Sequence, residues 1–596
     1  MNLIDKQLKT AIVEAFQALF DFKLDVSDFE LQPTRKEFEG THTLVVFSYL
    51  RHTKKGPEQS GEAIGDYLKT NTSIVSDYNV VKGFLNLSIS EKAWISVLEK
   101  ISGDAAYGTF EATGEKVMVE FSSPNTNKPL HLGHLRNNFL GDSVSRILAA
   151  RGHEVMKVNL VNDRGIHICK SMLAYEKFGA GETPDSTGIK GDKLIGNYYV
   201  RFDQEYKKEI EGLIHQGMDP EEAKKQAPLM LEAQEMLKKW EQGDEATVAL
   251  WKQMNGWVFD GFDISYETMG IVFDKVYYES DTYLLGKDII QEGLDNGVFF
   301  KKEDNSVWVD LTADKLDEKL VLRGDGTSVY MTQDIGTCDL KHKDFPFNRS
   351  VYVVGNEQDY HFKVLFTIMD KLGRDYANGL YHLSYGMVDL PTGKMKSREG
   401  TVVDADDLMQ EMFDTAQKQT EELGKIEGLT AEEAEELFRT LGLGALKYFL
   451  LKVDPKKRML FNPQESIEFQ GNTGPFIQYT HARISAILRR ASSLEIGQDF
   501  DPAKVESIHP RVLDLIHKLT EYPKVIDGAA KDYSPALVAQ YVYELAKTYN
   551  GFYQDVPIFN EDNQEVVKFR IALSASVAKV IKSAMSMLGI GVPERM

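Results

Sequence analysis

The sequence predicts an α/β protein whose central domain is a doubly wound parallel sheet, with a small α+β domain before it and an all-helical bundle after it. Two strand-like runs, at 116–121 and 154–163, flank a stretch in which apolar residues recur at helical spacing. Strand, helix, strand is the repeating unit of such a sheet. Further strand-like runs at 306–311, 350–355 and 379–388 suggest that the sheet resumes there, and from about residue 430 nearly all apolar patterns are helical.

The N-terminal domain is expected to span 1–110. It opens on an amphipathic helical pattern, and the later segment GFLNLSIS at 83–90 alternates like a half-buried strand. This combination is typical of a small α+β unit.

We expect the parallel-sheet domain to span 111–465, with a helical insertion at about 180–260. The insertion is long and polar, and one helix start in it is clear: Asp219 caps the helix, Pro220 takes its first position and Glu222 completes a capping box. The two halves of one sheet are therefore separated in the sequence.

Residues 466–596 are expected to form the helical bundle. Its last helix should end at Gly589, with Pro593 beyond. The apolar residues that share one face of this helix are Val566, Phe569, Leu573, Val577, Val580, Ile581, Ala584 and Leu588.

Composition limits the class of protein. The chain has 596 residues, of which 42% are hydrophobic and 27% charged, as in a soluble protein of several domains. No segment approaches the roughly 18 apolar residues of a membrane span, and the N-terminus lacks the features of a signal peptide. The two cysteines, Cys169 and Cys338, lie too far apart in the sequence to suggest a disulfide framework or a cysteine zinc module. We therefore expect a cytoplasmic protein with no membrane contact.

The net charge of −22 disfavours nucleic-acid binding overall, because phosphate binding needs lysine or arginine. An RNA partner would have to use local basic patches. DPKKRM at 454–459 and HARISAILRR at 481–490 are such patches, although each is equally consistent with an ordinary solvated helix face.

The tetrapeptide HLGH at 131–134 follows a predicted strand and opens a predicted helix. Ligands of doubly wound folds collect at this edge of the sheet, and helix N-termini attract phosphate. Gly133 would let a flat base approach the backbone. His131 and His134 could donate hydrogen bonds to phosphate oxygens during a displacement at phosphorus. A zinc site and purely structural, capping histidines are the alternatives, and zinc lacks a third ligand at the expected spacing.

A second basic element, PTGKMKSREGTVVDADDL, occupies 391–408. Two glycines bracket Lys394, Lys396 and Arg398, an arrangement suited to a triphosphate and its leaving pyrophosphate. Taken alone, such a charged loop is more often plain surface.

These two elements resemble the HIGH and KMSKS signatures of class I aminoacyl-tRNA synthetases, and EFSSPNTNKPLHLGHLRN resembles arginyl-tRNA synthetases in particular. GNTGPFIQYTHARI at 471–484 and LGIGVPERM at 588–596 are similar to the same family, so the resemblance runs from about residue 80 to the end of the chain.

The resemblance implies a Rossmann-type catalytic domain, an anticodon-binding helical bundle and ATP-dependent ligation of L-arginine to tRNA(Arg). The reaction would pass through an arginyl-adenylate, after tRNA has bound, and end on the 2′-hydroxyl of the terminal adenosine. Mg²⁺ would arrive with ATP, with no metal held structurally by the protein. We expect a monomer, and no editing domain is evident.

The resemblance also implies an arginine site. Its residues would be Glu120, Ser123, Asn125, Tyr330, Asp334 and Gln358. Asp334 would hold the guanidinium through two hydrogen bonds. Tyr330 and Asp334 stand four residues apart and would share a helix face, which without the family match would read as an exposed face.

For ATP, the matching residues are His131, Gly133, His134, Gly355, Met387 with the backbone of Gly386, and Lys394. His361 would be a pocket neighbour or a core histidine. The chain departs from the family where Ser397 replaces the second lysine of KMSKS. Lys128 is our candidate substitute for that charge, with Lys396 and Arg398 as competitors.

For tRNA, the matching residues are Phe476, Tyr479, Arg483 and Tyr553 in the bundle, and Phe84 and Asn86 in the N-terminal domain. Aromatic side chains read unpaired bases by stacking. Each of these residues could instead belong to a packed core. Two other classes of protein stay open, a small-molecule nucleotidyltransferase and an RNA-binding paralogue without catalysis.

Overall fold

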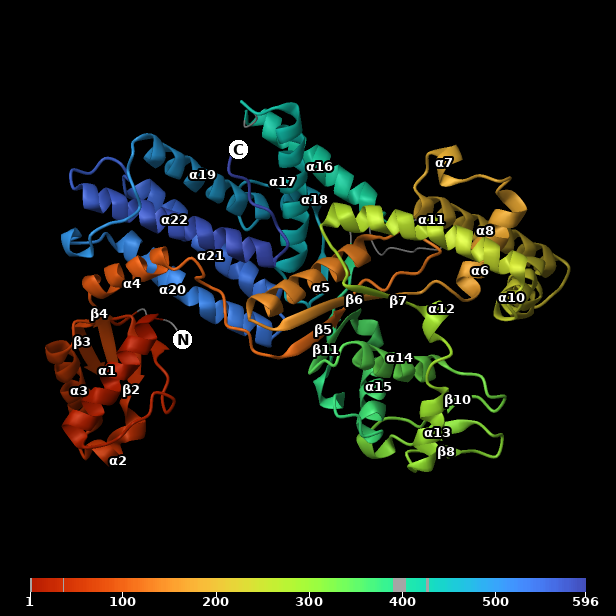
Figure 1. Ribbon diagram of the computed structural model, residues 1–596, viewed down its shortest axis with the longest axis horizontal. Helices are drawn as coiled ribbons and strands as arrows, with labels where there is room; N and C mark the ends of the chain where they lie inside the picture. Colours follow the sequence, from red (N-terminus) through yellow and green to blue (C-terminus); the bar gives the residue numbers. More distant parts are fainter. Residues whose placement is uncertain (1–2, 36, 390–402, 425–427) are drawn as a thin grey trace.

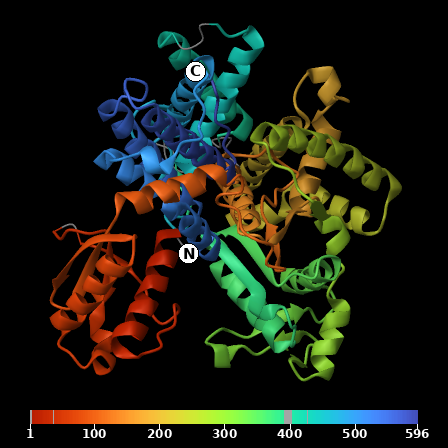
Figure 2. The ribbon, with the colours of Figure 1, turned by 60° about the vertical axis from the view of Figure 1, so that its left-hand side comes forward.

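The computed structural model describes residues 3–35, 37–389, 403–424 and 428–596. The N-terminal domain and the helical insertion lie at opposite ends of the molecule, with the parallel sheet between them (Figures 1 and 2). The C-terminal helices pack on one side of that sheet. The predicted fold class, a parallel-sheet α/β domain with a helical C-terminal part, is confirmed.

The N-terminal domain is an antiparallel sheet covered by helices. The strand order is β1-β2-β4-β3, and the strand expected at 83–90 is β4. Its strands are β1 (Gln32–Pro33), β2 (His42–Val45), β3 (Val75–Val81) and β4 (Phe84–Ile89). Its helices are α1 (Leu3–Phe20), η1 (Val46–Tyr49), α2 (Leu50–Thr53), α3 (Pro57–Asn71) and α4 (Glu91–Gly103).

The central sheet has five strands in the order β12-β11-β5-β6-β7, and every pairing in it is parallel. Its strands are β5 (Lys116–Glu120), β6 (Glu154–Val161), β7 (Lys275–Tyr278), β11 (Arg349–Gly355) and β12 (Leu380–Tyr385). The chain runs from β5 outward through β6 and β7, and then returns to the other side of β5 with β11 and β12. The order therefore reverses between β5 and β11, and ligands of such sheets bind at the carboxyl ends of the strands beside that reversal.

One strand prediction is wrong, and one strand was missed. The run at 306–311 is not part of the parallel sheet. It forms β9 (Val307–Val309) of a separate antiparallel sheet with β8 (Phe299–Lys301) and β10 (Lys319–Leu322). A short apolar run cannot distinguish these two strand types, and the tight turn that ends at Asn305, with φ of 63°, joins β8 to β9. Conversely, β7 was missed because its four residues give no usable period.

Helices flank the parallel sheet and form the insertion. They are α5 (Leu132–Ala150), α6 (Ile166–Phe178), α7 (Pro184–Thr187), α8 (Gly191–His215), α9 (Pro220–Gln226), α10 (Pro228–Glu241), α11 (Glu245–Met269), α12 (Glu279–Thr282), α13 (Lys287–Asp295), η2 (Thr312–Asp314), α14 (Tyr330–Asp344), η3 (Asn356–Gln358), α15 (Asp359–Lys371) and η4 (Ala377–Gly379). Asp219 caps α9 as predicted, by accepting from the backbone of Glu221 and Glu222. The capping box is wrong, because the Glu222 carboxylate accepts from the side chain of Gln226 instead.

The C-terminal part is helical. Its elements are β13 (Val388–Asp389), which pairs with β14 (Met459–Leu460), and the helices α16 (Ala405–Glu422), α17 (Ala431–Leu451), α18 (Pro463–Ser466), α19 (Gly474–Ser493), η6 (Pro502–Lys504), α20 (Pro510–Lys531), α21 (Pro535–Asp555) and α22 (Gln564–Met587). Gly589 follows α22 with a φ of 68°, the left-handed conformation that ends a helix, as predicted. Helix α5 of the sheet domain packs against α17, α20 and α22, so one core joins the two parts. Within the described residues, no helix is both long and apolar enough to span a membrane.

Candidate active site and RNA-binding surface

The chain leaves β5 through a strained turn at the carboxyl edge of the sheet. Ser122 and Ser123 have φ values of 77° and 45°, in the left-handed region that residues other than glycine rarely adopt. Their N–H groups donate to Oδ1 of Asn137 (2.6 Å) and of Asn159 (3.0 Å). Strain of this kind costs about 1–3 kcal/mol per residue and gathers at functional sites, where the surroundings impose it.

The HLGH segment then begins helix α5, and both histidines cap it. Nδ1 of His131 accepts from the N–H of Gly133 at 3.1 Å, and Nδ1 of His134 accepts from the N–H of His131 at 3.0 Å. The ring centroids lie 3.9 Å apart. The alternative of capping histidines is therefore correct for the Nδ1 atoms. These caps do not use Nε2 of either ring.

Both histidines are held neutral. Burial, followed by the positive charge of Lys128, lowers the pKa of His131 to about 4. Burial, with the charges of His131 and Lys128, lowers the pKa of His134 well below its usual value. Because each Nδ1 accepts a hydrogen bond, the ring proton lies on Nε2, and each ring offers one N–H donor at neutral pH.

Gly133 is required by the ring of His131. A Cβ atom at this position would lie 2.9 Å from Cε1 of His131. The glycine therefore makes room for the imidazole, a reason that differs from the close approach of a base expected from the sequence. No cluster of three or more possible metal ligands occurs among the described residues, and no structural observation supports the zinc alternative.

The expected adenine-binding residues meet at the ends of β11 and β12. A Cβ added at Gly355 would lie 3.9 Å from Sδ of Met387, whose side chain is 37% exposed. The neighbouring backbone is already engaged, since the N–H of Gly386 donates to Pro455 and the carbonyl of Met387 accepts from Met459. Gly355 and the partly exposed Met387 therefore lie close together at this edge of the sheet.

Helix α14 carries the expected guanidinium partner. Tyr330 begins the helix and is 76% exposed, and Asp334 lies one turn further on. Oδ2 of Asp334 lies 2.7 Å from Nε2 of His361, and this hydrogen bond raises the pKa of His361. His361 therefore contacts the expected guanidinium partner, and the partly exposed Asp334 carboxylate is oriented rather than buried.

A second carboxylate, Glu279, was missed by the sequence analysis. It begins α12, directly after β7, and is largely buried. Burial raises its pKa, Arg164 opposes that rise, and the charges of Asp163 and Asp334 add to it, so these carboxylates lie within electrostatic reach of one another. The available sequence signal was an acidic residue at the carboxyl end of a strand. Because β7 was not predicted, this signal could not be recognised.

The structure does not bring every expected residue to the cleft. Glu120 forms an ion pair with Lys341, and both side chains are buried, so its carboxylate is committed within the protein. Asn125 and Gln358 are exposed at the carboxyl edge of the sheet, and Asn125 bridges to Asn162 of the neighbouring strand end. Ser123 is half-buried in the strained turn.

The basic loop lies mostly outside the described residues. Lys394, Lys396, Ser397 and Arg398 fall within 390–402, for which no structure is described. The described chain resumes directly against the HLGH turn: the N–H of Leu132 donates to Val403 (3.2 Å), and that of Ala405 donates to Leu130 (3.0 Å). The residues that directly follow the loop therefore contact the HLGH turn.

Two arginines and two aromatic side chains help to line a pocket on the C-terminal helices. The guanidinium of Arg483 lies 4.9 Å from the ring of Tyr479 and 5.0 Å from that of Tyr553, and it donates to Asn550. Tyr553 is 42% exposed. The pocket has a volume of about 490 Å³, and its lining includes Arg483, Arg490, Tyr553 and Phe559. Phe476 packs instead against the ring of Tyr543 and is half-buried.

The two expected residues of the N-terminal domain differ in placement. Phe84 is partly exposed, and its ring contacts the ring of Phe47. The guanidinium of Arg35 lies 6.0 Å from the centre of the Phe84 ring. Asn86 is only 2% exposed, accepts from Thr43 and donates to Asn79. For Asn86 the core alternative is correct, because an alternating strand pattern does not say which face is covered.

A five-stranded parallel sheet with the HLGH turn at the start of its first crossover helix, followed by a helical C-terminal part, is the arrangement expected of a class I aminoacyl-tRNA synthetase. Residues 97–462 match the model of the tRNA synthetases class I (R) catalytic domain, and residues 477–596 match that of the DALR anticodon binding domain. The chain is 59% identical to an Arginine--tRNA ligase of Amoebophilus asiaticus and 57% identical to one of Bacteroides thetaiotaomicron, with 100% of each chain covered. It therefore belongs to the arginyl-tRNA synthetase family.

Solved structures share the fold at lower identity. The arginyl-tRNA synthetase of Thermus thermophilus superimposes with a TM-score of 0.78 at 23% identity, covering 99% of this chain and 100% of that one. That of Plasmodium falciparum gives 0.75 at 20% identity, with 100% of both chains covered. The whole chain thus follows one known architecture.

Proposed function

We propose that this protein activates L-arginine with ATP and transfers it to tRNA(Arg). A carboxylate oxygen of arginine attacks the α-phosphorus of ATP, the bond from that phosphorus to pyrophosphate breaks, and arginyl-adenylate forms. The 2′-hydroxyl of the terminal adenosine of tRNA then takes the arginyl group, and AMP leaves. Family membership supplies the substrates, and the observation that carries the chemistry is the pair of neutral imidazoles at the sheet edge.

In this proposal His131 and His134 donate from Nε2 to oxygens of the phosphate at which displacement occurs. Donors fixed before the reaction stabilise the charge that develops in the transition state, and each such donor is worth about 10²- to 10³-fold in rate. The Nδ1 hydrogen bonds support this role, because they fix both the orientation and the tautomer of each ring.

Asp334 is proposed to hold the guanidinium through two charge-assisted hydrogen bonds, with Glu279 as a second carboxylate and Tyr330 at the mouth of the site. The support is their joint negative charge and the orientation that His361 gives to Asp334. A site built to bond a guanidinium rejects analogues that lack it by roughly 10⁴-fold, so no editing step is needed. Glu120 is kept as a weaker candidate, since its use would require the Lys341 ion pair to open.

Lys128 is proposed to supply the charge that Ser397 does not. Its charge already acts on both histidines, which supports a position beside the phosphates. Lys394, Lys396 and Arg398 remain candidates on sequence grounds. Mg²⁺ would enter as part of the MgATP substrate, and we assign no protein ligand to it.

For tRNA, we propose that unpaired bases stack on Tyr479 and Tyr553 around Arg483, and that Phe84 contacts a second part of the RNA. The exposed ring of Tyr553 and the adjacent pocket support this. The division into domains at 1–110, 111–465 and 466–596, the monomeric state and the cytoplasmic location stay predictions.

The test is aminoacylation of tRNA(Arg) with each of the twenty amino acids, paired with arginine-dependent ATP–pyrophosphate exchange with and without tRNA. We expect charging with arginine alone and exchange only when tRNA is present. Exchange without any binding of tRNA to a filter would instead indicate a small-molecule nucleotidyltransferase. Binding of tRNA without charging would indicate a non-catalytic RNA-binding protein.

A further inference from the structure

Insertion helix α8 contacts the segment that leads into the HLGH turn. A Cβ atom at Gly196 of this helix would lie 2.7 Å from Cδ of Pro129 and 3.5 Å from Cα of Lys128. The helix therefore lies against the chain just before His131 as closely as a glycine permits. Any larger residue at this position would force the two segments apart.

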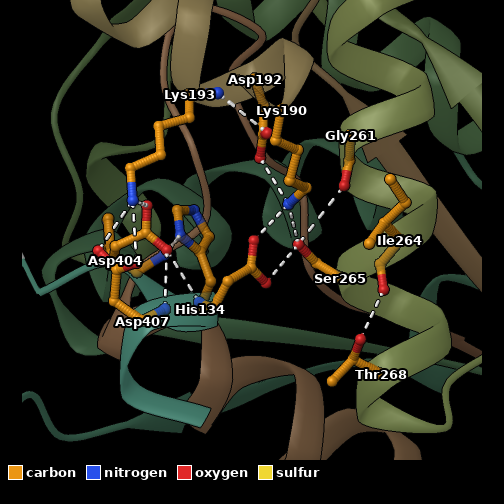
Figure 3. Close-up of polar contacts among 12 residues, drawn as sticks. His134, Lys190, Asp192, Lys193, Gly261, Ile264, Ser265, Thr268, Asp404 and Asp407 are labelled. Atoms are coloured by element: carbon orange, nitrogen blue, oxygen red, sulfur yellow. Dashed lines mark hydrogen bonds and ion pairs between the residues drawn. The ribbon is translucent and has the colours of Figure 1, made fainter. Parts of the chain in front are cut away.

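The same helix also bonds to the chain on the other side of the HLGH turn. Lys190, at the start of α8, donates to Asp192 (3.1 Å) and to Oγ of Ser265 on α11 (2.5 Å) (Figure 3). It also donates to the carboxylate of Asp406 on α16. Ser265 also donates to Oδ1 of Asp406 at 2.8 Å. Asp406 is thus bonded to two elements of the insertion at once.

This network is partly buried, since the side chains of Lys190 and Asp406 are 18% and 33% exposed. The side chains of Asp192 and Ser265 are buried, and a Cβ at Gly261 would lie 2.6 Å from Oδ1 of Asp192. Ion pairs contribute little net stability whether exposed or buried, because screening or desolvation offsets their attraction. The Lys190–Asp406 pair is therefore better suited to holding a segment in place than to stabilising the fold.

The segment held by Asp406 is bonded to the backbone of the catalytic turn. Asp404 caps α16 by accepting from the N–H of Asp406 at 2.8 Å. Val403 and Ala405, on either side of Asp404, bond to the backbone of Leu132 and Leu130, on either side of His131. A displacement of Asp406 would therefore move the backbone of residues 403–405, and these residues are bonded to the backbone on either side of His131.

We propose that Asp406, held by Lys190, is a positioning residue for the His131–His134 pair, and that the helical insertion serves as a brace for the catalytic turn. The inference rests on the proposed function, in which those imidazoles act on the phosphate. It assigns a role to the helical insertion, which lies outside both signature sequences. A misplacement of about 1 Å at a catalytic group can cost on the order of 100-fold in rate. A contact that fixes the position of the two imidazoles therefore matters to the reaction.

The test is the Asp406→Asn variant, which removes the charge that faces Lys190 and leaves the Lys190–Asp192 pair intact. We expect kcat for arginine-dependent ATP–pyrophosphate exchange to fall about tenfold, with KM for arginine and Kd for tRNA within about twofold of the wild-type values. Asp406→Glu should recover part of the loss. A purely structural defect would instead lower tRNA binding together with kcat.

Asp407→Asn is the matched control. It makes the same change at the adjacent residue, whose exposed carboxylate pairs with Lys193 at 2.9 Å on the same helix. Exposed pairs contribute little, so its kcat should stay within about twofold of the wild type. The double variant Lys190→Met, Asp406→Asn should lose no more kcat than Lys190→Met alone. Both substitutions remove the same Lys190–Asp406 ion pair, so their effects should not add.

The inference is overturned if Asp406→Asn keeps wild-type kcat, if it behaves as Asp407→Asn does, or if the Lys190 and Asp406 losses multiply. A wild-type enzyme with no arginine-dependent exchange would overturn the proposed function itself. The two failures are distinguishable, because the first is measured on an active enzyme.

Discussion

The HLGH turn and the pocket on α19 both depend on ring side chains, but they hold them in opposite ways. At the turn, a ring nitrogen of each histidine bonds to the backbone, and both side chains are largely withdrawn from water. At the pocket, Tyr553 is exposed, and Tyr479 and Tyr553 contact Arg483 through their ring faces. Displacement at phosphorus needs donors fixed before the reaction, whereas reading unpaired RNA needs surfaces that accept different bases. The predictions below test this contrast, from the largest effect to the smallest.

The strongest way to break the contrast is to remove one donor at the turn without removing its cap. In His134→Asn the side-chain oxygen can replace Nδ1 as acceptor for the His131 N–H, but nothing replaces Nε2–H. We expect kcat for pyrophosphate exchange to fall about 10²- to 10³-fold, the loss typical of one transition-state donor. The stability measured by thermal unfolding should change little.

His134→Gln is the control for this prediction, because its amide can reach the position of Nε2 and should recover part of the rate. Wild-type rates for both the Asn and the Gln variants would mean that the donor has no role. The turn would then be purely structural, like any capped helix start.

The next effect concerns the arginine end of the cleft. Asp334→Asn keeps the shape and removes the charge, so kcat/KM for arginine should fall about 100-fold, since hydrogen bonds between charged groups are about twice as strong as neutral ones. The loss should appear mainly in KM for arginine, with KM for ATP unchanged. Asp317→Asn, which alters an exposed carboxylate bonded to Tyr360, is the control and should have no effect. An unchanged KM for arginine in Asp334→Asn would remove Asp334 from the site.

What the sequence could predict depended on how local the signal was. The HLGH turn is a continuous strand, loop and helix start, and its elements lie where the pattern indicated. Glu279 was not predictable in this way, because β7 pairs with β6 across the whole insertion and has only four residues. The ion pair of Glu120 with Lys341 joins residues of two distant elements, and no spacing rule links them.

The RNA surface was predictable in kind but not residue by residue. The spacing of Phe476, Tyr479 and Arg483 on one helix was readable, yet the structure buries part of Phe476 against Tyr543 and leaves Tyr553 of α21 exposed. The same holds for Asn86, whose strand alternates correctly while its inward face belongs to the core. Periodicity gives the face of an element, and only packing says what covers that face.

The pocket should show smaller losses spread over several residues. We expect Tyr553→Ala and Arg483→Met each to raise Kd for tRNA(Arg) about tenfold, since stacking contributes about 1–3 kcal/mol per base. Exchange at saturating tRNA should stay near the wild-type rate. Leu537→Ala, a similarly exposed residue on the same helix as Tyr553, is the control. A loss of kcat instead of Kd would contradict the division of roles between the two regions.

The smallest effect is on the pH dependence of stability, and it tests the turn because burial lowers the pKa of His131 there to about 4. His131 has a pKa of about 4 when folded and about 6.5 when unfolded. Between these values the unfolded chain binds a proton that the folded protein excludes, so the free energy of unfolding should decrease as pH falls from 6.5 toward 4. Below the folded pKa this contribution should level off.

Urea unfolding of the wild type and of His131→Asn at several pH values measures this contribution. The variant retains an acceptor for the Gly133 N–H but has no imidazole, so its free energy of unfolding should depend less steeply on pH between 4 and 6.5. Above about pH 7.5 the two curves should run parallel, because a histidine that is neutral in both states contributes no slope. Identical slopes below pH 6.5 would mean that the His131 ring takes up a proton freely in the folded protein. The turn would then have lost the fixed, neutral donor that separates it from the adaptable surface on α19.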